Sequence, residues 1–308
     1  MSRLADSLEP AEQYFRNRVE HLSISGDRLE AQLAFPADLE GPPDTSHGGA
    51  VSAMLLELVR LFLEQQNSAA DLGPAMEMEV LLHRGLPLET AVQAEVQAGA
   101  TAWRSRLLRD GRAVAEATIR PLPGVAAPTS GGLFPGASAV ENSEAVPAYE
   151  SCFGCGVRNA RGLQVRFRYT PEWLWQHVTP QAHFRSADGT LFPGYLLVLC
   201  DELGWWLGAL HAGECGVSNR LILQVSPAPP GRLLAVGSRS RVQGTDPRGR
   251  LWQTEAAVFG SNGQTVATAR VQFVSSAAFT RLMLPRFRGM DDGGTVARVF
   301  PRYRDALG

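Results

Sequence analysis

The chain has 308 residues, 44% of them hydrophobic and 19% charged, and this composition excludes an intrinsically disordered chain. At about 150 residues per domain, the length predicts two cores of similar size. The formal net charge of -2 provides no positive field for binding nucleic acid or an anionic membrane surface. All 29 basic residues are arginines, which excludes Schiff-base chemistry on a lysine and a P-loop.

Four cysteines, at positions 152, 155, 200 and 215, are too few for a disulfide framework, and no secretory leader opens the chain. We therefore expect free thiols and a cytoplasmic protein. The most apolar run, Gly194 to Leu210, carries Asp201 and Glu202 near its centre. Two adjacent acids argue against a membrane span, so this run predicts a helix buried in a protein core.

The composition changes between Pro121 and Pro147, where Pro, Gly, Ser and Ala predominate. We interpret residues 123–149 as a linker between an N-terminal domain, 1–122, and a C-terminal domain, 150–277. Residues 278–308 have no counterpart in the first half and contain arginines at 281, 286, 288, 298, 302 and 304. We expect a solvated tail there, with neutralisation of a phosphate group as the alternative.

The elements on the two sides of the linker follow the same order. Hydrophobic periodicity predicts, in the first half, a strand at 29–35, a helix after residue 49, and strands at 76–82, 91–97, 103–109 and 113–119. The second half predicts a strand at 174–180, a helix at 195–210, and strands at 217–225, 233–242, 251–259 and 265–274. Asp110-Gly111 and Asn262-Gly263 each predict a two-residue hairpin turn. The repeat indicates an α+β protein in which antiparallel strands wrap a central helix, twice.

Several short segments resemble hot-dog-fold thioesterases of the phenylacetate-degradation (PaaI-like) type. They include Gly41-Pro42-Pro43 and His47-Gly48-Gly49-Ala50-Val51 in the first half. In the second half they are Cys152-Phe153-Gly154-Cys155-Gly156, Asn159, Gly162-Leu163 and Cys200-Asp201-Glu202-Leu203-Gly204-Trp205. The resemblance covers nearly the whole chain. It implies two hot-dog domains in tandem, packed as an internal pseudo-dimer, and hydrolysis of an acyl-CoA thioester.

The family forms its catalytic site across two facing hot dogs. One presents the His-Gly-Gly helix start, and the other an acid nine residues beyond its own His position. Here the first half keeps His47 but has Leu56 at the acid position, whereas the second half has Phe192 in place of His and Asp201 as the acid. The resemblance therefore implies one complete site and one dead site per chain. Glu57 aligns with Glu202, and one residue along a helix is about 100° of rotation, so Glu57 is not a displaced catalytic acid.

Thioester hydrolysis needs a polarised carbonyl and a nucleophile. The N–H groups of Gly48 and Gly49, at the start of a helix, are expected to bind the developing oxyanion. Asp201 is expected to act as a general base or as the nucleophile. His47 is expected to hydrogen-bond the substrate or the helix start. The alternative for both Asp201 and His47 is a structural role, in which the buried side chain only makes hydrogen bonds to neighbouring groups.

Two further residues are candidates at the start of the next strand. Ser218 matches the place where relatives carry a hydroxyl that assists the acid, and Asn219, one residue along, is a candidate for substrate binding. Cys152 and Cys155 have metal-ligand spacing, but a closed zinc site needs four ligands and no second pair follows. We expect a tight turn there, no metal, and no cofactor beyond the CoA of the substrate.

The leading hypothesis is an acyl-CoA thioesterase that acts on acyl-CoA or acyl-pantetheine and has no nucleic-acid or membrane partner. The alternative is a catalytically inactive hot-dog protein that binds an acyl or aromatic ligand or serves as an assembly module. A hot-dog dehydratase is less expected, because its helix usually presents an Asp and a His close together. Exposed sheet edges favour a homodimer of such chains.

Overall fold

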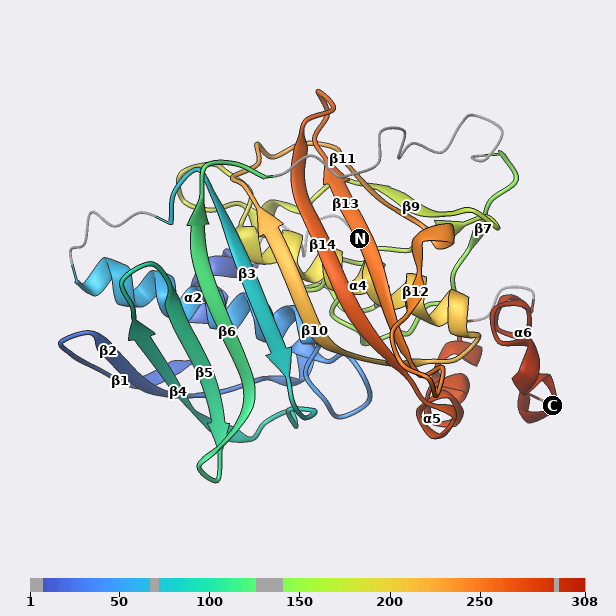
Figure 1. The fold of residues 1–308 in the computed structure, drawn as a ribbon, viewed down its shortest axis with the longest axis horizontal. Helices are drawn as coiled ribbons and strands as arrows, with labels where there is room; N and C mark the ends of the chain where they lie inside the picture. Colours follow the sequence, from blue (N-terminus) through green and yellow to red (C-terminus); the bar gives the residue numbers. More distant parts are fainter. Residues whose placement is uncertain (1–7, 67–71, 126–140, 291–293, 308) are drawn as a thin grey trace.

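The computed structural model describes residues 8–66, 72–125, 141–290 and 294–307, and shows two halves that each hold one long helix (Figure 1). The first half opens with α1 (Ala11–Arg16), β1 (Val19–Ser25) and β2 (Arg28–Ala34). Its central helix is α2 (Gly48–Gln65). The strands β3 (Ala75–Leu82), β4 (Ala91–Ala98), β5 (Trp103–Arg109) and β6 (Arg112–Leu122) follow.

The second half repeats this order with shorter opening strands. These are β7 (Glu144–Ala145), β8 (Arg168–Tyr169) and β9 (Trp173–Val178). The central helix is α4 (Pro193–Ala212). After it come β10 (Gly216–Val225), β11 (Leu233–Ser238), β12 (Gln243–Gly244), β13 (Leu251–Phe259) and β14 (Thr265–Ser275). Short 3-10 helices lie at 37–39, 182–184 and 239–241.

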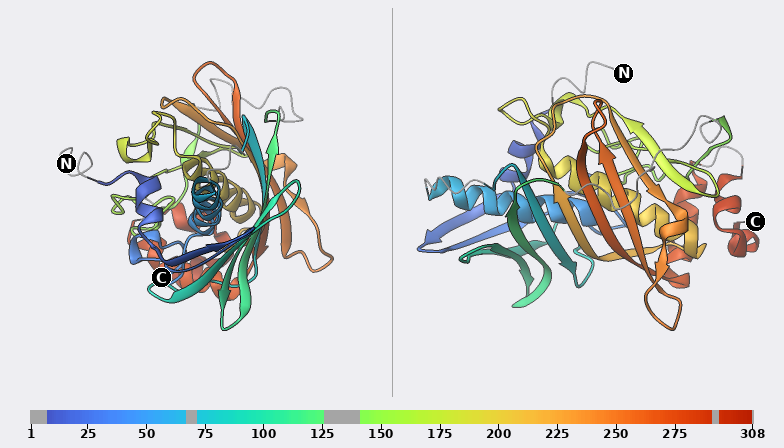
Figure 2. Two further views of the ribbon diagram at one scale, coloured as in Figure 1. Left: turned by 90° about the vertical axis from the view of Figure 1, so that its left-hand side faces the viewer. Right: turned by 45° about the horizontal axis from the view of Figure 1, so that its top comes forward.

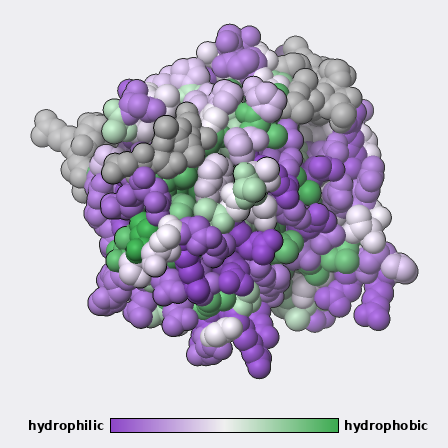
Figure 3. Space-filling view, turned by 60° about the vertical axis from the view of Figure 1, so that its left-hand side comes forward, coloured by the Kyte–Doolittle hydropathy of each residue, from purple (hydrophilic) through white to green (hydrophobic). Residues whose placement is uncertain are grey.

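The strands form one antiparallel sheet that runs through both halves, in the order β1-β2-β4-β5-β6-β3-β10-β14-β13-β11-β9-β8-β7, with β12 beside β13. The halves join at β3 and β10, where Met76 pairs with Val225 and Leu81 with Arg220. The sheet curves around α2 and α4, which lie side by side on its inner face (Figure 2). Alternation along each strand turns apolar side chains toward the helices, as β2 shows with Leu29, Ala31 and Leu33 buried. On the face in Figure 3, hydrophilic side chains accordingly predominate, and hydrophobic ones form small separate groups.

The two helices approach each other closely at their N-terminal turns. A Cβ atom on Gly49 would lie 2.5 Å from Val198 Cα, and one on Gly194 would lie 2.9 Å from Ala53 Cβ. Glycine permits this approach because it has no Cβ. These pairs also show that α2 and α4 run in opposite directions, so the start of each helix faces the first turns of the other. No helix of the described ranges is long and apolar enough to cross a membrane.

The segment after β14 is folded, so the expectation of a solvated tail is wrong for most of it. It forms α5 (Ala277–Arg288), α6 (Thr295–Val299) and a 3-10 helix at 301–307. α5 is amphipathic: Met283, Leu284 and Phe287 are buried, while the three arginines of this helix, at 281, 286 and 288, are exposed. The apolar spacing therefore decides the structure here, and the arginines occupy the solvent face.

The two hairpin predictions have different outcomes. Asp110-Gly111 forms the expected two-residue turn between β5 and β6, with φ of 51° and 70°. Asn262-Gly263 instead lies in a longer loop, because Phe259 pairs with Thr265 and the Gly260 N–H donates to the Gln264 carbonyl. The predicted strand 233–242 ends early, at Ser238, where a 3-10 turn begins.

The linker is shorter than its composition suggested. The first residues of the Pro-rich run, Pro121 and Leu122, belong to β6 and pair with β3. Residues 144–145 form β7, which pairs with β8. Residues 126–140 lie outside the described part of the chain.

Candidate active site

A cavity of about 310 Å³ lies where the first turn of α2 and the middle of α4 meet β10 and the loop that precedes β8. Both halves contribute to its wall. Besides the Gly48 backbone, the wall has the polar residues Thr45, Ser46, His47, His83, Arg84, Tyr149, Cys152, Cys155, Asp201, Glu202, Ser218 and Asn219. The structure therefore brings five of the six predicted site residues to one cavity. The sixth, Gly49, packs against α4 instead.

His47 is the N-cap of α2 and is 4% exposed. Its Nδ1 accepts a hydrogen bond from the Gly49 N–H at 3.0 Å and lies 3.5 Å from Asp201 Oδ2. Its Nε2 lies 2.9 Å from Glu202 Oε2. A side chain of the first half thus contacts two acids of the second half.

The two contacts of His47 Nδ1 correspond to two protonation states. A neutral ring with its proton on Nε2 accepts from Gly49, whereas a protonated ring directs an N–H at Asp201. Burial opposes a charge on His47, but the hydrogen bonds with Cys152 and Glu202 outweigh it, and the pKa of His47 lies well above its usual value. His47 can therefore take up or release a proton beside Asp201.

Asp201 lies in the third turn of α4 and is 4% exposed. Ser218 Oγ donates a hydrogen bond of 2.7 Å to Asp201 Oδ1, which fixes the orientation of the carboxylate. Burial raises the pKa of Asp201, against the lowering effects of His47 and Ser218. A carboxylate with these surroundings, in the wall of a cavity, has the properties of a general base.

Asn219 reaches the same cavity because of an irregularity in β10. The pairing of β10 with β14 shifts register between Ser218 and Arg220, and such a bulge redirects side chains next to it. The side-chain oxygens of Asn219 and Ser46 are buried and have no hydrogen-bond partner among the described residues. Buried polar atoms usually have partners, so these two oxygens can accept hydrogen bonds from water or from a bound molecule.

Glu202 is the residue that the sequence interpretation missed. Trp206 Nε1 donates to its Oε1 at 2.9 Å, and its Oε2 faces both His47 and Cys152. The signal in the sequence was the pair of adjacent acids in an apolar helix, of which only Asp201 was given a role. A buried acid with three polar neighbours belongs to the site.

The structure changes one part of the expected oxyanion site. The Gly49 N–H already donates to His47 Nδ1, so it is not free for a substrate oxygen in this state. Gly48 is the first residue of α2, where an N–H group has no acceptor within the helix. A Cβ atom on Gly48 would lie 2.9 Å from Asp201 Oδ2, so this backbone adjoins the carboxylate directly.

Three of the buried groups have the spacing of metal ligands: His47, Cys152 and Glu202 place their ligand atoms within 4.8 Å of one another. Such a set could hold zinc. A metal on His47 Nε2 would require the proton to move to Nδ1, and the capping bond from Gly49 would be lost. The absence of a metal and of an added cofactor stays a prediction from the sequence.

A further part of the wall comes from α4 and α5 and is mostly aromatic. Its members are Trp205, Trp206, Phe279, Met283 and Phe287. The rings of Trp206 and Phe287 pack with centroids 5.6 Å apart. The cavity thus combines polar groups with a large apolar surface, as small-molecule sites usually do.

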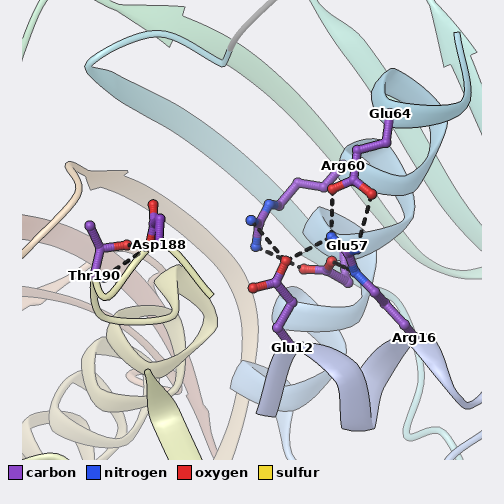
Figure 4. A network of polar contacts seen from close by, with 7 residues as sticks. All are labelled: Glu12, Arg16, Glu57, Arg60, Glu64, Asp188 and Thr190. Carbon is purple, nitrogen blue, oxygen red and sulfur yellow. Dashed lines mark hydrogen bonds and ion pairs between the residues drawn. The ribbon is translucent and has the colours of Figure 1, made fainter. Parts of the chain in front are cut away.

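The equivalent positions at the other helix start have different side chains. Phe192 replaces His47 and is buried, with its ring centroid 5.7 Å from that of Phe15. Leu56, fully buried, stands in the place of Asp201. Glu57, equivalent to Glu202, is held by Arg16 at 2.6 Å and by Arg60 at 3.1 Å (Figure 4).

No protein-family model matches the sequence, and no curated protein matches it either. Solved structures do match. A protein of Novosphingobium aromaticivorans, named provisionally as a thioesterase, has a TM-score of 0.56 at 19% identity over 83% of this chain and 98% of its own. A hot-dog-fold protein of Alicyclobacillus acidocaldarius has a TM-score of 0.54 at 14% identity, with 86% and 98% covered. The dehydratase domain of PpsC from Mycobacterium tuberculosis, solved with C12:1-CoA, has a TM-score of 0.56 at 14% identity, with 84% and 98% covered.

The chain has the hot-dog fold. Its similarity to these structures extends over nearly the whole of each neighbour, so the large antiparallel sheet and the central helices are matched together. Identities below 20% show the fold, and the chemistry must be argued from the site itself.

Proposed function

We propose that the chain is an acyl-CoA thioesterase with one complete site, formed between the two halves of a tandem of hot dogs. The observation that supports this most strongly is the meeting of His47, from the start of α2, with Asp201, from α4, at 3.5 Å in the wall of one cavity. The equivalent pair, Phe192 and Leu56, has no group that can transfer a proton. We therefore propose that the second helix start is inactive.

In the proposed mechanism, Asp201 removes a proton from a water molecule that attacks the thioester carbonyl carbon. Ser218 holds the carboxylate in position. The Gly48 N–H stabilises the oxyanion, with the positive end of the α2 dipole behind it. The carbon–sulfur bond then breaks, and protonated His47 can supply the proton that the leaving thiolate takes up. The products are a carboxylic acid and a free thiol.

The binding surface supports an acyl-CoA as substrate. The aromatic wall from α4 and α5 suits the acyl group, and Asn219 Oδ1 is an acceptor for an amide N–H of the pantetheine arm. The PpsC domain, a structural neighbour, was solved with an acyl-CoA. The PaaI-like type, the cytoplasmic location and the homodimer stay predictions.

The test is release of free thiol from short, medium, long and aromatic acyl-CoAs by the wild type and by Asp201→Asn. We expect turnover of at least one substrate, and a loss of at least about 100-fold in the variant because a general base is removed. Glu57→Gln is the matched control, since it makes the same kind of change on the other central helix, and its turnover should stay near that of the wild type. If the wild type is inert on all substrates but binds them, the inactive binding protein is the better description.

A second candidate is dehydration of a 3-hydroxyacyl thioester. The sequence argued against it because no Asp and His lie close together along one helix, but the structure brings His47 and Asp201 together from different helices. An acid and a base facing one acyl cavity are what removal of water from a hydroxyacyl group requires. A 3-hydroxyacyl-CoA therefore belongs in the panel: an enoyl-CoA product found by mass spectrometry, without thiol release, would favour the dehydratase.

A further inference from the structure

The loop Cys152–Gly156 lies directly on the two acids and the histidine. A Cβ atom on Gly154 would lie 2.5 Å from Glu202 Oε2 and 2.8 Å from His47 Nε2, so only glycine fits there. In the same loop, Cys152 Sγ lies 3.9 Å from Glu202 Oε2 and within 4.8 Å of a ring nitrogen of His47. The mechanism described above gives this thiol no role.

Cys152 differs from the other described cysteines in its surroundings. The Cys155 N–H points at Cys152 Sγ at 3.4 Å. The hydrogen bond from the Cys155 thiol, with help from His47, lowers the pKa of Cys152 to about 7, although burial and Glu202 oppose this. Burial raises the pKa of Cys200 to about 12, and it also raises the pKa of Cys215. Among the described cysteines, Cys152 therefore has the surroundings that most favour loss of the thiol proton.

Cys152 also lines the same cavity as Asp201, Gly48 and Asn219. A thioester bound there would meet both the start of α2, at Gly48, and the Cys152 sulfur. Thiolates attack thioester carbonyls readily, and the exchange replaces one thioester with another.

We propose that Cys152 is an acyl-accepting nucleophile, so that the protein carries its acyl group on this sulfur during the reaction. This inference rests on the proposed function. The Cys152 thiolate adds to the thioester carbonyl carbon, the bond from that carbon to the CoA sulfur breaks, and CoA leaves as a thiol after it takes up a proton. Water, deprotonated by Asp201, then attacks the S-acyl group. The acid is released and the Cys152 thiol is restored, so no oxidant or other co-reactant is needed.

The experiment follows the intact protein by mass spectrometry after rapid acid quenching of a mixture with the best acyl-CoA of the panel. Asp201→Asn is the informative variant, because it retains Cys152 but loses the base that removes the acyl group. We expect one acyl group per chain to accumulate in this variant, to map to Cys152 after digestion, and to be removed by hydroxylamine. Cys152→Ala should give no adduct and should lose at least about 100-fold in turnover.

Two cysteine variants serve as controls. Cys200→Ala removes a buried thiol next to Asp201 in the sequence. The double variant Cys200→Ala, Asp201→Asn should form the adduct to the same extent as Asp201→Asn alone. Cys155→Ala should still form it, but with its rate rising at higher pH, because the donor that lowers the Cys152 pKa is gone while His47 and Glu202 remain.

The results separate the two proposals. If Asp201→Asn loses turnover but no adduct forms, and Cys152→Ala keeps wild-type turnover, then Cys152 is not a nucleophile and direct attack by water remains. An adduct that maps to any other residue also overturns the inference. An adduct on Cys152 in a wild type that never hydrolyses it supports the acyl-accepting role and refutes the thioesterase.

Discussion

The two helix starts occupy equivalent positions, yet their surroundings differ completely. At the start of α2, His47 faces Asp201 and Glu202 across a cavity of about 310 Å³. At the start of α4, Phe192 packs on Phe15, and the residues that replace the acid and the histidine are apolar. The acid that both helices retain has different partners: Glu202 contacts a histidine, a thiol and an indole N–H, whereas two arginines surround Glu57.

This comparison shows how one fold can hold a reactive acid and a structural one at matching places. Two guanidinium groups each donate a hydrogen bond to the buried Glu57 carboxylate, one to each oxygen. Both oxygens are therefore engaged in ion pairs. Glu202 and Asp201 have no arginine partner among the described contacts, and their neighbours can exchange protons. Reactive character here depends on what surrounds the carboxylate, more than on its place in the helix.

The largest effect should come from making the two helix starts alike. We expect His47→Phe, which copies the second half, to lower turnover at least about 100-fold, because it removes the proton-transferring group next to Asp201. The measurement is thiol release with the best acyl-CoA. The reverse change, Phe192→His, should leave turnover unchanged, because Leu56 supplies no acid. Retention of activity in His47→Phe would show that the histidine is only a helix cap.

A smaller effect is expected on stability at the helix crossing. Gly49→Ala should reduce the free energy of unfolding by about 1–3 kcal/mol, because the new Cβ would meet the Val198 backbone at 2.5 Å. Gly194→Ala is the matched change, and its new Cβ would meet the Phe192 ring at 2.3 Å and Ala53 Cβ at 2.9 Å. The Phe192 ring can turn more easily than the Val198 backbone can shift, so Gly194→Ala should cost less. Urea unfolding of both variants decides the order, and equal losses would contradict it.

The smallest effect concerns pH. Burial raises the pKa of Asp201, so the folded chain binds this proton more tightly than the unfolded chain. The stability linked to Asp201 is therefore greatest at low pH and is lost as pH rises through the folded pKa. Asp201→Asn does not lose stability in this way, so it should be more stable than the wild type at about pH 8. The difference in stability between the two proteins should be smaller at about pH 5. Thermal unfolding of both proteins from about pH 5 to about pH 8 provides the measurement. A stability difference that does not change with pH would contradict a raised pKa of Asp201.

Regular periodicity made most of the fold predictable. The central helices and the strands from β3 to β6 lie where their hydrophobic patterns placed them, because each pattern reports which face is buried. Several elements were not predicted, among them α1, β1, β7, β8 and α6, and two failures have an identifiable cause. α5 was obscured by arginines that all occupy its exposed face, and the shape of the Asn262-Gly263 loop was set by the Gly260 and Gln264 backbone.

The candidate site was predictable only where equivalence between the halves could be used. The resemblance to a family with its site across two facing hot dogs, together with the alignment of Leu56 with Asp201, led to the pairing of His47 with the acid of the other half. The contacts of Glu202 and Cys152 could not be predicted, because they depend on how the loop Cys152–Gly156 folds onto α4. No spacing along the chain reports such a long-range contact.

The pairing of β3 with β10 has a consequence for how the protein is made. β3 is an inner strand in the finished sheet, yet its partner is translated about 140 residues later, so a nascent first half presents an unpaired edge that includes Met76, Met78 and Val80. Until the ribosome has completed β10, this edge is open to other chains or to a chaperone. A chain cut at the linker would keep that edge permanently, and a truncated first half should aggregate where the full-length protein does not.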